Sequence, residues 1–192
     1  MDSTTQKERL VEAGLRLFHE QGYGAVGVRE IAEAAGVPKG SFTNHFRSKE
    51  RFGQLVLDRY FERLEAVMAE TLQRRDLPPR ERLDAYFDRI EEGLAGGEWR
   101  RGCLVADLCA EVPSQSDVIR LRLGEILTQQ AARFADALRE TAAAGGHGGS
   151  EADIEDRAGV LIAAWHGTLL RMKVEQDPEA IRRFRRVLPR LL

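Results

Sequence analysis

The chain has 192 residues, of which 43% are hydrophobic, 31% charged and 7% aromatic, and its formal net charge is -2. This composition excludes a disordered chain and predicts a folded protein, with room for one large core or for a small domain joined to a second. The near-zero net charge argues against a protein whose only partner is nucleic acid, but it allows a local basic face.

The N-terminal residues and the cysteine content indicate the compartment. The first ten residues, MDSTTQKERL, are polar, and no segment approaches the apolar length needed to span a bilayer. The two cysteines, Cys103 and Cys109, are too few for a disulfide-stabilised fold and fit a reducing compartment. We therefore expect a cytoplasmic protein with no membrane partner.

Three short helices are predicted in the first quarter of the chain. Apolar residues share one face from Lys7 to Gln21, and Gly22 ends this helix. A second amphipathic helix begins at Val28 and stops at Gly36, and Pro38 begins the third. A 3.6-residue period that breaks at a glycine and restarts at a proline places two helices at a sharp angle. This is a helix-turn-helix, whose second helix suits the major groove of DNA.

Helix signals continue to the C-terminus, and strand signals do not appear. Ser48 is a good N-cap for a long fourth helix, and the residues from Gly145 to Ser150 form a flexible linker by composition. Helices are further predicted at residues 80–94, 103–112, 117–144 with Ser116 or Asp117 as its cap, 151–175, and 178–192 with Asp177 as its cap. We predict an all-α fold of about nine helices, with a three-helix head (residues 1–47) and a larger helical body (residues 48–192).

The segment GVREIAEAAGVPKGSFTNHFRSKE resembles the DNA-binding signature of the TetR family of bacterial transcriptional regulators. The turn, the Gly-Ser-Phe entry, the His-Phe pair and the Ser-Lys-Glu restart all occur in register. The resemblance implies a helix-turn-helix head that binds double-stranded operator DNA, and a body that binds a small-molecule effector and forms a homodimer. The expected function is that of a ligand-responsive repressor released from a palindromic operator by its effector; activation remains an alternative.

The geometry of the predicted third helix divides its residues between core and DNA. Phe42 and Phe46 are spaced i and i+4 and should face the core of the head. The residues expected at the DNA are of two kinds. The helix geometry turns Lys39, Gly40, Ser41 and Thr43 outward, where base edges are read. The family resemblance implies that Arg29, at the start of the preceding helix, also reads a base, and that Asn44, His45 and Lys49 contact phosphates.

Two positions depart from the usual pattern of the family. Gly27 stands where a threonine or serine commonly caps the second helix, at a cost of a few tenths of a kcal/mol. Thr43 stands where a tyrosine is usual in the recognition helix. The shorter side chain should change the local contacts and favour a thymine methyl group.

The last two helices carry the prediction of a dimer. Val160, Ala163, Ala164, Gly167 and Leu170 follow one helix, and an apolar stripe follows the other at Ile181, Phe184, Leu188 and Leu191. These faces could pack within one chain, whereas the family resemblance implies a four-helix interface between two subunits. Beside them lie Arg182, Arg183, Arg185, Arg186 and Arg190, which suit either a solvated face next to the dimer interface or a helix that binds a membrane surface or nucleic acid.

Large or polarisable residues of the body are expected to line the effector site. They are Tyr86, Trp99, Cys103, Phe134, Trp165, His166 and Met172. The segment RGCLVADLCAEV also resembles a stretch of TetR-type regulators that respond to electrophiles or oxidants, which implies an alternative function with Cys103 as the redox sensor. Arg100 and Arg101 would lower the pKa of that thiol, while a small buried residue is the simpler interpretation of both cysteines.

Other function classes find less support in the sequence. The four histidines are scattered and no set of ligands has metal spacing, so we expect no metal and no cofactor. A nucleophile elbow, a phosphate-binding loop and a paired-carboxylate site are missing from the sequence, and we expect no enzyme. The remaining alternative is a helical interaction module whose head binds protein instead of DNA.

Overall fold

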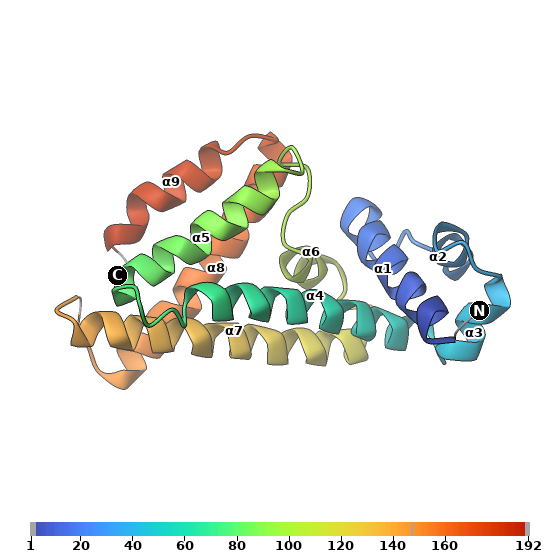
Figure 1. The fold of residues 1–192 in the computed structure, drawn as a ribbon, viewed down its shortest axis with the longest axis horizontal. Helices are drawn as coiled ribbons and strands as arrows, with labels where there is room; N and C mark the ends of the chain where they lie inside the picture. Colours follow the sequence, from blue (N-terminus) through green and yellow to red (C-terminus); the bar gives the residue numbers. More distant parts are fainter. Residues whose placement is uncertain (1–2, 147, 191–192) are drawn as a thin grey trace. The chain divides into compact units, whose positions relative to one another are not determined.

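The computed structural model describes residues 3–146 and 148–190, and nine α-helices and one 3-10 helix account for the regular structure of these residues. Figure 1 shows them in order along the chain. The helices are α1 (Ser3–Gln21), α2 (Val28–Ala34), α3 (Lys39–His45), α4 (Lys49–Thr71), α5 (Pro79–Ala95), α6 (Leu104–Glu111), α7 (Asp117–Ala143), α8 (Glu151–Glu175) and α9 (Glu179–Val187), followed by the 3-10 helix Leu188–Arg190. The predicted all-α fold class is confirmed.

Several predicted helix boundaries are confirmed by their caps. Ser48 Oγ accepts the Arg51 N–H at the start of α4, and α8 has the predicted bounds. At α7 the structure decides between the two predicted caps, because Ser116 Oγ accepts the Ile119 N–H. At α9 the N-cap residue by backbone geometry is Pro178, one residue later than predicted, although Asp177 still accepts the Glu179 N–H through its carboxylate. Leu191 and Leu192, at the end of the predicted last helix, lie outside the described residues.

The chain forms two compact units. The first contains residues 1–63 and 104–125, and the second contains residues 64–103 and 126–192. Packing thus groups α6 and the start of α7 with the first three helices and most of α4. The predicted boundary at residue 47 falls at the start of α4 and stays a prediction about the DNA-binding and effector-binding parts.

The core of the first unit is built around aromatic side chains from three helices. Phe42 of α3 and Phe46, which follows the last residue of α3, point inward, as predicted, and their ring centres lie 5.0 and 4.8 Å from that of Phe52 in α4. Phe18 of α1 reaches the same Phe52 ring at 6.0 Å. All four side chains are at most 4% exposed. Their burial stabilises the unit by about 2 kcal/mol for each ring, and it fixes α3 against the helices behind it.

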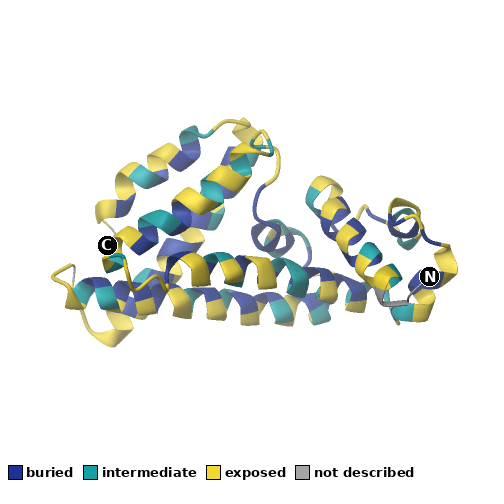
Figure 2. Ribbon diagram, viewed as in Figure 1, coloured by how far each residue is buried: buried dark blue, intermediate teal, exposed yellow. Residues whose placement is uncertain are grey.

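The second unit has its own aromatic core. Tyr86 and Phe87 of α5 pack against Phe134 of α7, and Phe87 also packs against Trp165 of α8 and Phe184 of α9, at centroid distances between 4.9 and 6.0 Å. Figure 2 shows the resulting alternation of buried and exposed residues along each helix. Among the described residues no helix combines the length and the apolar character required of a membrane span.

Candidate nucleic-acid interface

The turn between α2 and α3 is closed by backbone hydrogen bonds. Gly36 adopts φ +62°, a left-handed conformation that glycine reaches without steric cost. The next residue, Val37, donates its N–H to the Ala32 carbonyl at 3.0 Å. Arg9 of α1 donates to the Gly36 carbonyl at 2.9 Å and ties the turn to the first helix. These contacts fix the turn between α2 and α3 that the sequence predicted.

The outer face of α3 is polar and open. Lys39, Gly40, Thr43 and Asn44 are exposed, and His45 is half-buried. A Cβ atom placed on Gly40 would meet nothing within 4 Å, so the space beside its Cα is open. The Thr43 hydroxyl donates its proton to the Gly40 carbonyl at 2.9 Å. The contact of this exposed polar face with the major groove of DNA stays a prediction.

The prediction that Ser41 faces outward is wrong. Ser41 is buried, with 9% of its surface exposed. Because α3 packs against both α1 and α2, its buried face is wider than the stripe formed by Phe42 and Phe46. This wider face includes Ser41.

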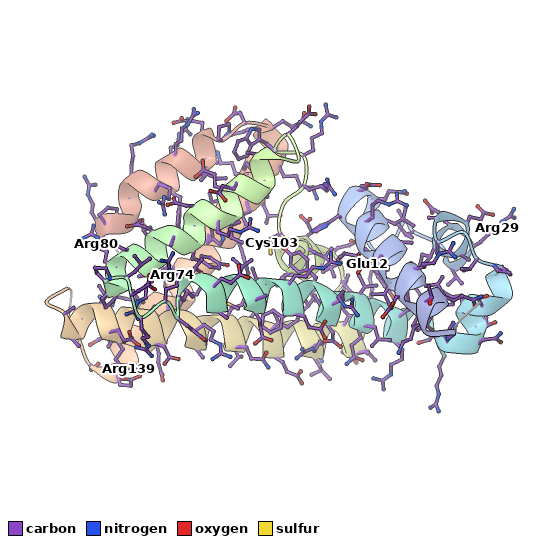
Figure 3. The ribbon with its side chains drawn as sticks, viewed as in Figure 1. Glu12, Arg29, Arg74, Arg80, Cys103 and Arg139 are labelled. Carbon is purple, nitrogen blue, oxygen red and sulfur yellow. The ribbon has the colours of Figure 1, made fainter. Side chains whose placement is uncertain are left out.

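Arg29 lies at the start of α2 with its side chain in solvent (Figure 3). Its Nε donates to Glu33 Oε1 at 2.7 Å, one turn further along the helix. This hydrogen bond raises the pKa of Arg29 above its ordinary value, although the pair is exposed and contributes little stability. The Arg29 side chain is exposed despite this pair, and its contact with a base stays a prediction.

Lys49 has an intramolecular role that the sequence did not indicate. Its Nζ donates to the Tyr23 carbonyl at 2.6 Å and to the Gly24 carbonyl at 3.4 Å, and it lies 4.3 Å from the centre of the Tyr23 ring. Burial lowers the pKa of Lys49, and the nearby charge of Glu111 acts in the opposite direction. The predicted phosphate contact of Lys49 is untested and stays a prediction.

The predicted effector residues are only partly brought together. Tyr86, Phe134 and Trp165 belong to the aromatic core of the second unit, together with Phe87, which the sequence analysis missed. Burial, followed by the nearby Cys103, raises the pKa of Tyr86. Cys103 is therefore close to this cluster, and it is 6% exposed.

The other three members are placed differently. Met172 is fully buried on the same side of α8 as Trp165. Trp99 lies in the loop after α5 at φ +61° and is only half-buried. His166 is half-buried, and burial lowers its pKa to about 4, so it is neutral at neutral pH. The redox role of Cys103 stays a prediction.

Three cavities of the second unit, of about 400, 530 and 670 Å³, are lined by other residues. The first two lie along α7 and include Asp136 and Arg139, and the third is lined by Pro78, Thr141 and Pro189 among others. None of the seven predicted effector residues lines them. In the part of the chain that the structure describes, His, Cys, Asp and Glu side chains do not gather in any group of three or more able to hold a metal ion.

The two faces predicted for the dimer differ in burial. On α8, Val160, Ala163, Ala164, Gly167 and Leu170 are all exposed. The predicted stripe of α9 is instead buried within the chain, where Ile181, Phe184 and Leu188 are at most 7% exposed, and Leu191 lies outside the described residues. The α9 stripe is thus not available to a second subunit, because it covers the core of its own unit.

The arginines of α9 also differ in how far they are buried. Arg185 is half-buried, bonds to Asp88 and the Asp84 carbonyl, and lies over the Phe87 ring, so it belongs to the packing of α9 on α5. Arg183 and Arg186 are exposed and share Glu179.

Comparison with known proteins decides the family. Residues 10–52 match the description "Bacterial regulatory proteins, tetR family", and residues 79–188 match "Tetracyclin repressor-like, C-terminal domain". The chain belongs to the TetR family. It is a DNA-binding transcriptional regulator rather than an enzyme, as the sequence predicted.

The sequence similarity to known regulators extends over most of the chain. The HTH-type transcriptional repressor DhaR of Mycobacterium sp. (strain GP1) is 39% identical over 96% of this chain and 90% of its own length. The transcriptional regulator AcuR of Cereibacter sphaeroides is 35% identical over 98% and 86%. The crystal structure of a regulatory protein TetR from Rhodobacter sphaeroides superimposes with a TM-score of 0.90, at 35% identity, over 96% of this chain and 97% of that one.

Proposed function

We propose that this TetR-family member is a repressor that binds a palindromic operator as a homodimer in the cytoplasm and is released by a small-molecule effector. The observation that carries the proposal is the exposed polar face of α3, held on a closed helix-turn-helix in a chain whose relatives include a protein named a transcriptional repressor. The comparisons favour this function over a redox-sensing repressor or a protein-interaction module.

The exposed residues of the head support a division of roles at the operator. Arg29, Lys39 and Thr43 would contact base edges, with Gly40 allowing close approach of the backbone, and Asn44 and His45 would contact phosphates. The engaged hydroxyl of Thr43 favours contact between its methyl group and a thymine methyl. Ser41 is left out of this surface because it is buried.

The dimer would use the exposed apolar face of α8. Val160 is 61% exposed and Val174 is 83% exposed, and a Cβ atom on Gly167 would meet nothing within 4 Å of this chain. A two-fold dimer would present two recognition helices to half-sites about one DNA turn apart.

The effector would bind in the second unit, at the cluster of Tyr86, Phe134 and Trp165 with Cys103 beside it. Aromatic side chains with one hydroxyl and one thiol nearby would suit a small, mainly apolar molecule that carries a polar group. Such a molecule releases the operator only to the extent that it binds the released conformation more tightly.

Binding to the DNA upstream of the protein's own gene tests the proposal. Fluorescence anisotropy should show a much tighter complex with that duplex than with a shuffled duplex of equal length, and an affinity that falls with added salt. Equal affinity for both duplexes would contradict the proposal.

The variant Arg29→Ala tests the role of one residue. It should lose about 1–3 kcal/mol of discrimination at one base pair of each half-site and leave the preference at the other positions intact. The measurement is a series of operators with single base-pair changes, and Arg16→Ala, on the exposed side of α1, provides a control of the same charge.

A further inference from the structure

Glu111, the last residue of α6, accepts hydrogen bonds from the loop that leads into the helix-turn-helix. Its carboxylate accepts the backbone N–H of Tyr23 at 2.9 Å through Oε2 and that of Gly24 at 2.6 Å through Oε1. Two hydrogen bonds to one ionised acceptor are among the stronger polar contacts of a protein. They join the loop between α1 and α2 to a helix that lies 87 residues later in the sequence.

The loop admits this carboxylate because it contains glycines on both sides of Tyr23. A Cβ atom on Gly22 would lie 2.9 Å from Glu111 Oε2, and one on Gly24 would lie 2.9 Å from Oε1. Both distances are too short for a carbon and an oxygen that are not bonded. Any larger residue at either position would push the carboxylate away from the two N–H groups.

The opposite side of the same loop is held by Lys49. While Glu111 takes the N–H groups of Tyr23 and Gly24, Lys49 donates to the carbonyl groups of the same two residues. The Tyr23 ring packs against Phe18 at 5.3 Å and is 6% exposed. The loop is thus fixed by one anion from α6, one cation from α4 and one buried ring.

The position of this loop matters for DNA binding because α2 follows it directly. Only three residues separate Gly24 from Val28, the first residue of α2, and α2 packs against α3. Arg29 lies in the first turn of α2. A displaced loop therefore displaces both Arg29 and the support of the recognition helix.

We propose that Glu111 is a positioning residue for operator binding, which holds the α1–α2 loop, and through it α2 and α3, in the conformation that binds DNA. The residue lies outside the helix-turn-helix. It ends a helix that begins directly after Cys103, where the chain passes from the second unit into the first. The inference rests on the proposed function only where operator affinity is measured.

The variant Glu111→Gln tests this role with a matched control. It keeps the shape of the side chain but loses one acceptor and the charge, and we expect about a tenfold loss of operator affinity. The control is Glu12→Gln, which removes the same charge from an exposed carboxylate of the same unit, paired with Arg63. Removing a negative charge by itself favours DNA binding, so the control should bind as well as the unchanged protein or slightly better.

Amide hydrogen exchange measures the same contact without DNA. In Glu111→Gln the amide protons of Tyr23 and Gly24 should exchange faster, whereas the amide of Phe42 in α3 should keep its protection. This readout separates the two proposals, because it reports on Glu111 even if the unchanged protein fails to bind the chosen duplex. Unchanged exchange at both amides would overturn the inference.

The variant Gly24→Ala reaches the contact from the other side. Its methyl group displaces the carboxylate, so it should lower operator affinity to a similar degree as Glu111→Gln. Combining the two changes should add little, because both remove the same interaction. Full additivity of the two losses, or operator affinity in Glu111→Gln equal to that of Glu12→Gln, would show that Glu111 does not position the head.

Discussion

At the scale of single residues, the DNA-binding surface competes with contacts inside the chain. Arg29 bonds to Glu33 while both side chains are largely in solvent, at 80% and 64% exposure. Lys49 is held more firmly, by two carbonyl groups and a ring. The two residues that the motif predicts at the DNA are therefore not equally free to leave their contacts inside the chain. Arg29 can change partners at small cost, whereas Lys49 would have to leave the loop that positions α2.

The pair of Arg29 and Glu33 leads to a prediction for operator affinity. Glu33→Gln should tighten operator binding about two- to fivefold, because it frees Arg29 and removes a negative charge close to the DNA-binding face. Fluorescence anisotropy at fixed salt measures the change. In an Arg29→Ala background the gain should shrink to the part that comes from the charge alone. A gain of the same size with and without Arg29 would show that the ion pair does not restrain this residue.

At the scale of helices, caps explain where several elements begin. Ser150 starts α8 after the glycine-rich segment, and its Oγ accepts the Asp153 N–H at 3.2 Å. The Asp153 carboxylate accepts in return from the N–H and the hydroxyl of Ser150, at 2.8 and 2.6 Å. This reciprocal capping box satisfies N–H groups that the first turn of a helix leaves without partners.

The capping box gives a prediction for stability and its pH dependence. Ser150→Ala should lower the free energy of unfolding by about 1 kcal/mol at neutral pH, as measured by urea denaturation. Ser114→Ala in an exposed loop provides the control.

The hydrogen bonds from Ser150 lower the pKa of Asp153 below its ordinary value of 3.8. The ionised carboxylate therefore stabilises the fold above that pH, and this contribution is lost as the pH falls through the lowered pKa. A difference between the two proteins that stays constant from pH 7 to pH 2.5 would contradict the assignment.

These caps also show what the sequence can predict. The bounds of α8, the cap at Ser48 and the inward direction of Phe42 and Phe46 depend on residues within one or two turns, so periodicity and capping rules suffice to predict them. Ser41 was mispredicted because its burial depends on the packing of α3 against two other helices. The contact of Glu111 with Tyr23 joins positions far apart in the sequence, and no local pattern marks either partner.

At the scale of the whole molecule, two surfaces have to act together on one operator. The head presents one recognition helix, and a palindrome requires a second copy at a fixed distance. We propose that the exposed apolar residues of α8 contact that copy, whereas the apolar stripe of α9 is buried within its own chain. The interface that we propose is therefore narrower on α9 than the sequence predicted.

Charge placed on this face of α8 should separate dimerisation from folding. The double variant Val160→Glu and Val174→Glu should be a monomer by light scattering, because each change sets a charge inside the proposed interface, and two facing copies repel. Both side chains are exposed in the single chain, so its helical circular dichroism should be unchanged. The control is Leu121→Glu in α7. Leu121 is 58% exposed, and its replacement should leave the dimer intact.

The monomer should lose most of its preference for a full palindrome over a single half-site, because only a dimer engages both recognition helices at once. A double variant that remains a dimer would place the interface elsewhere on the molecule.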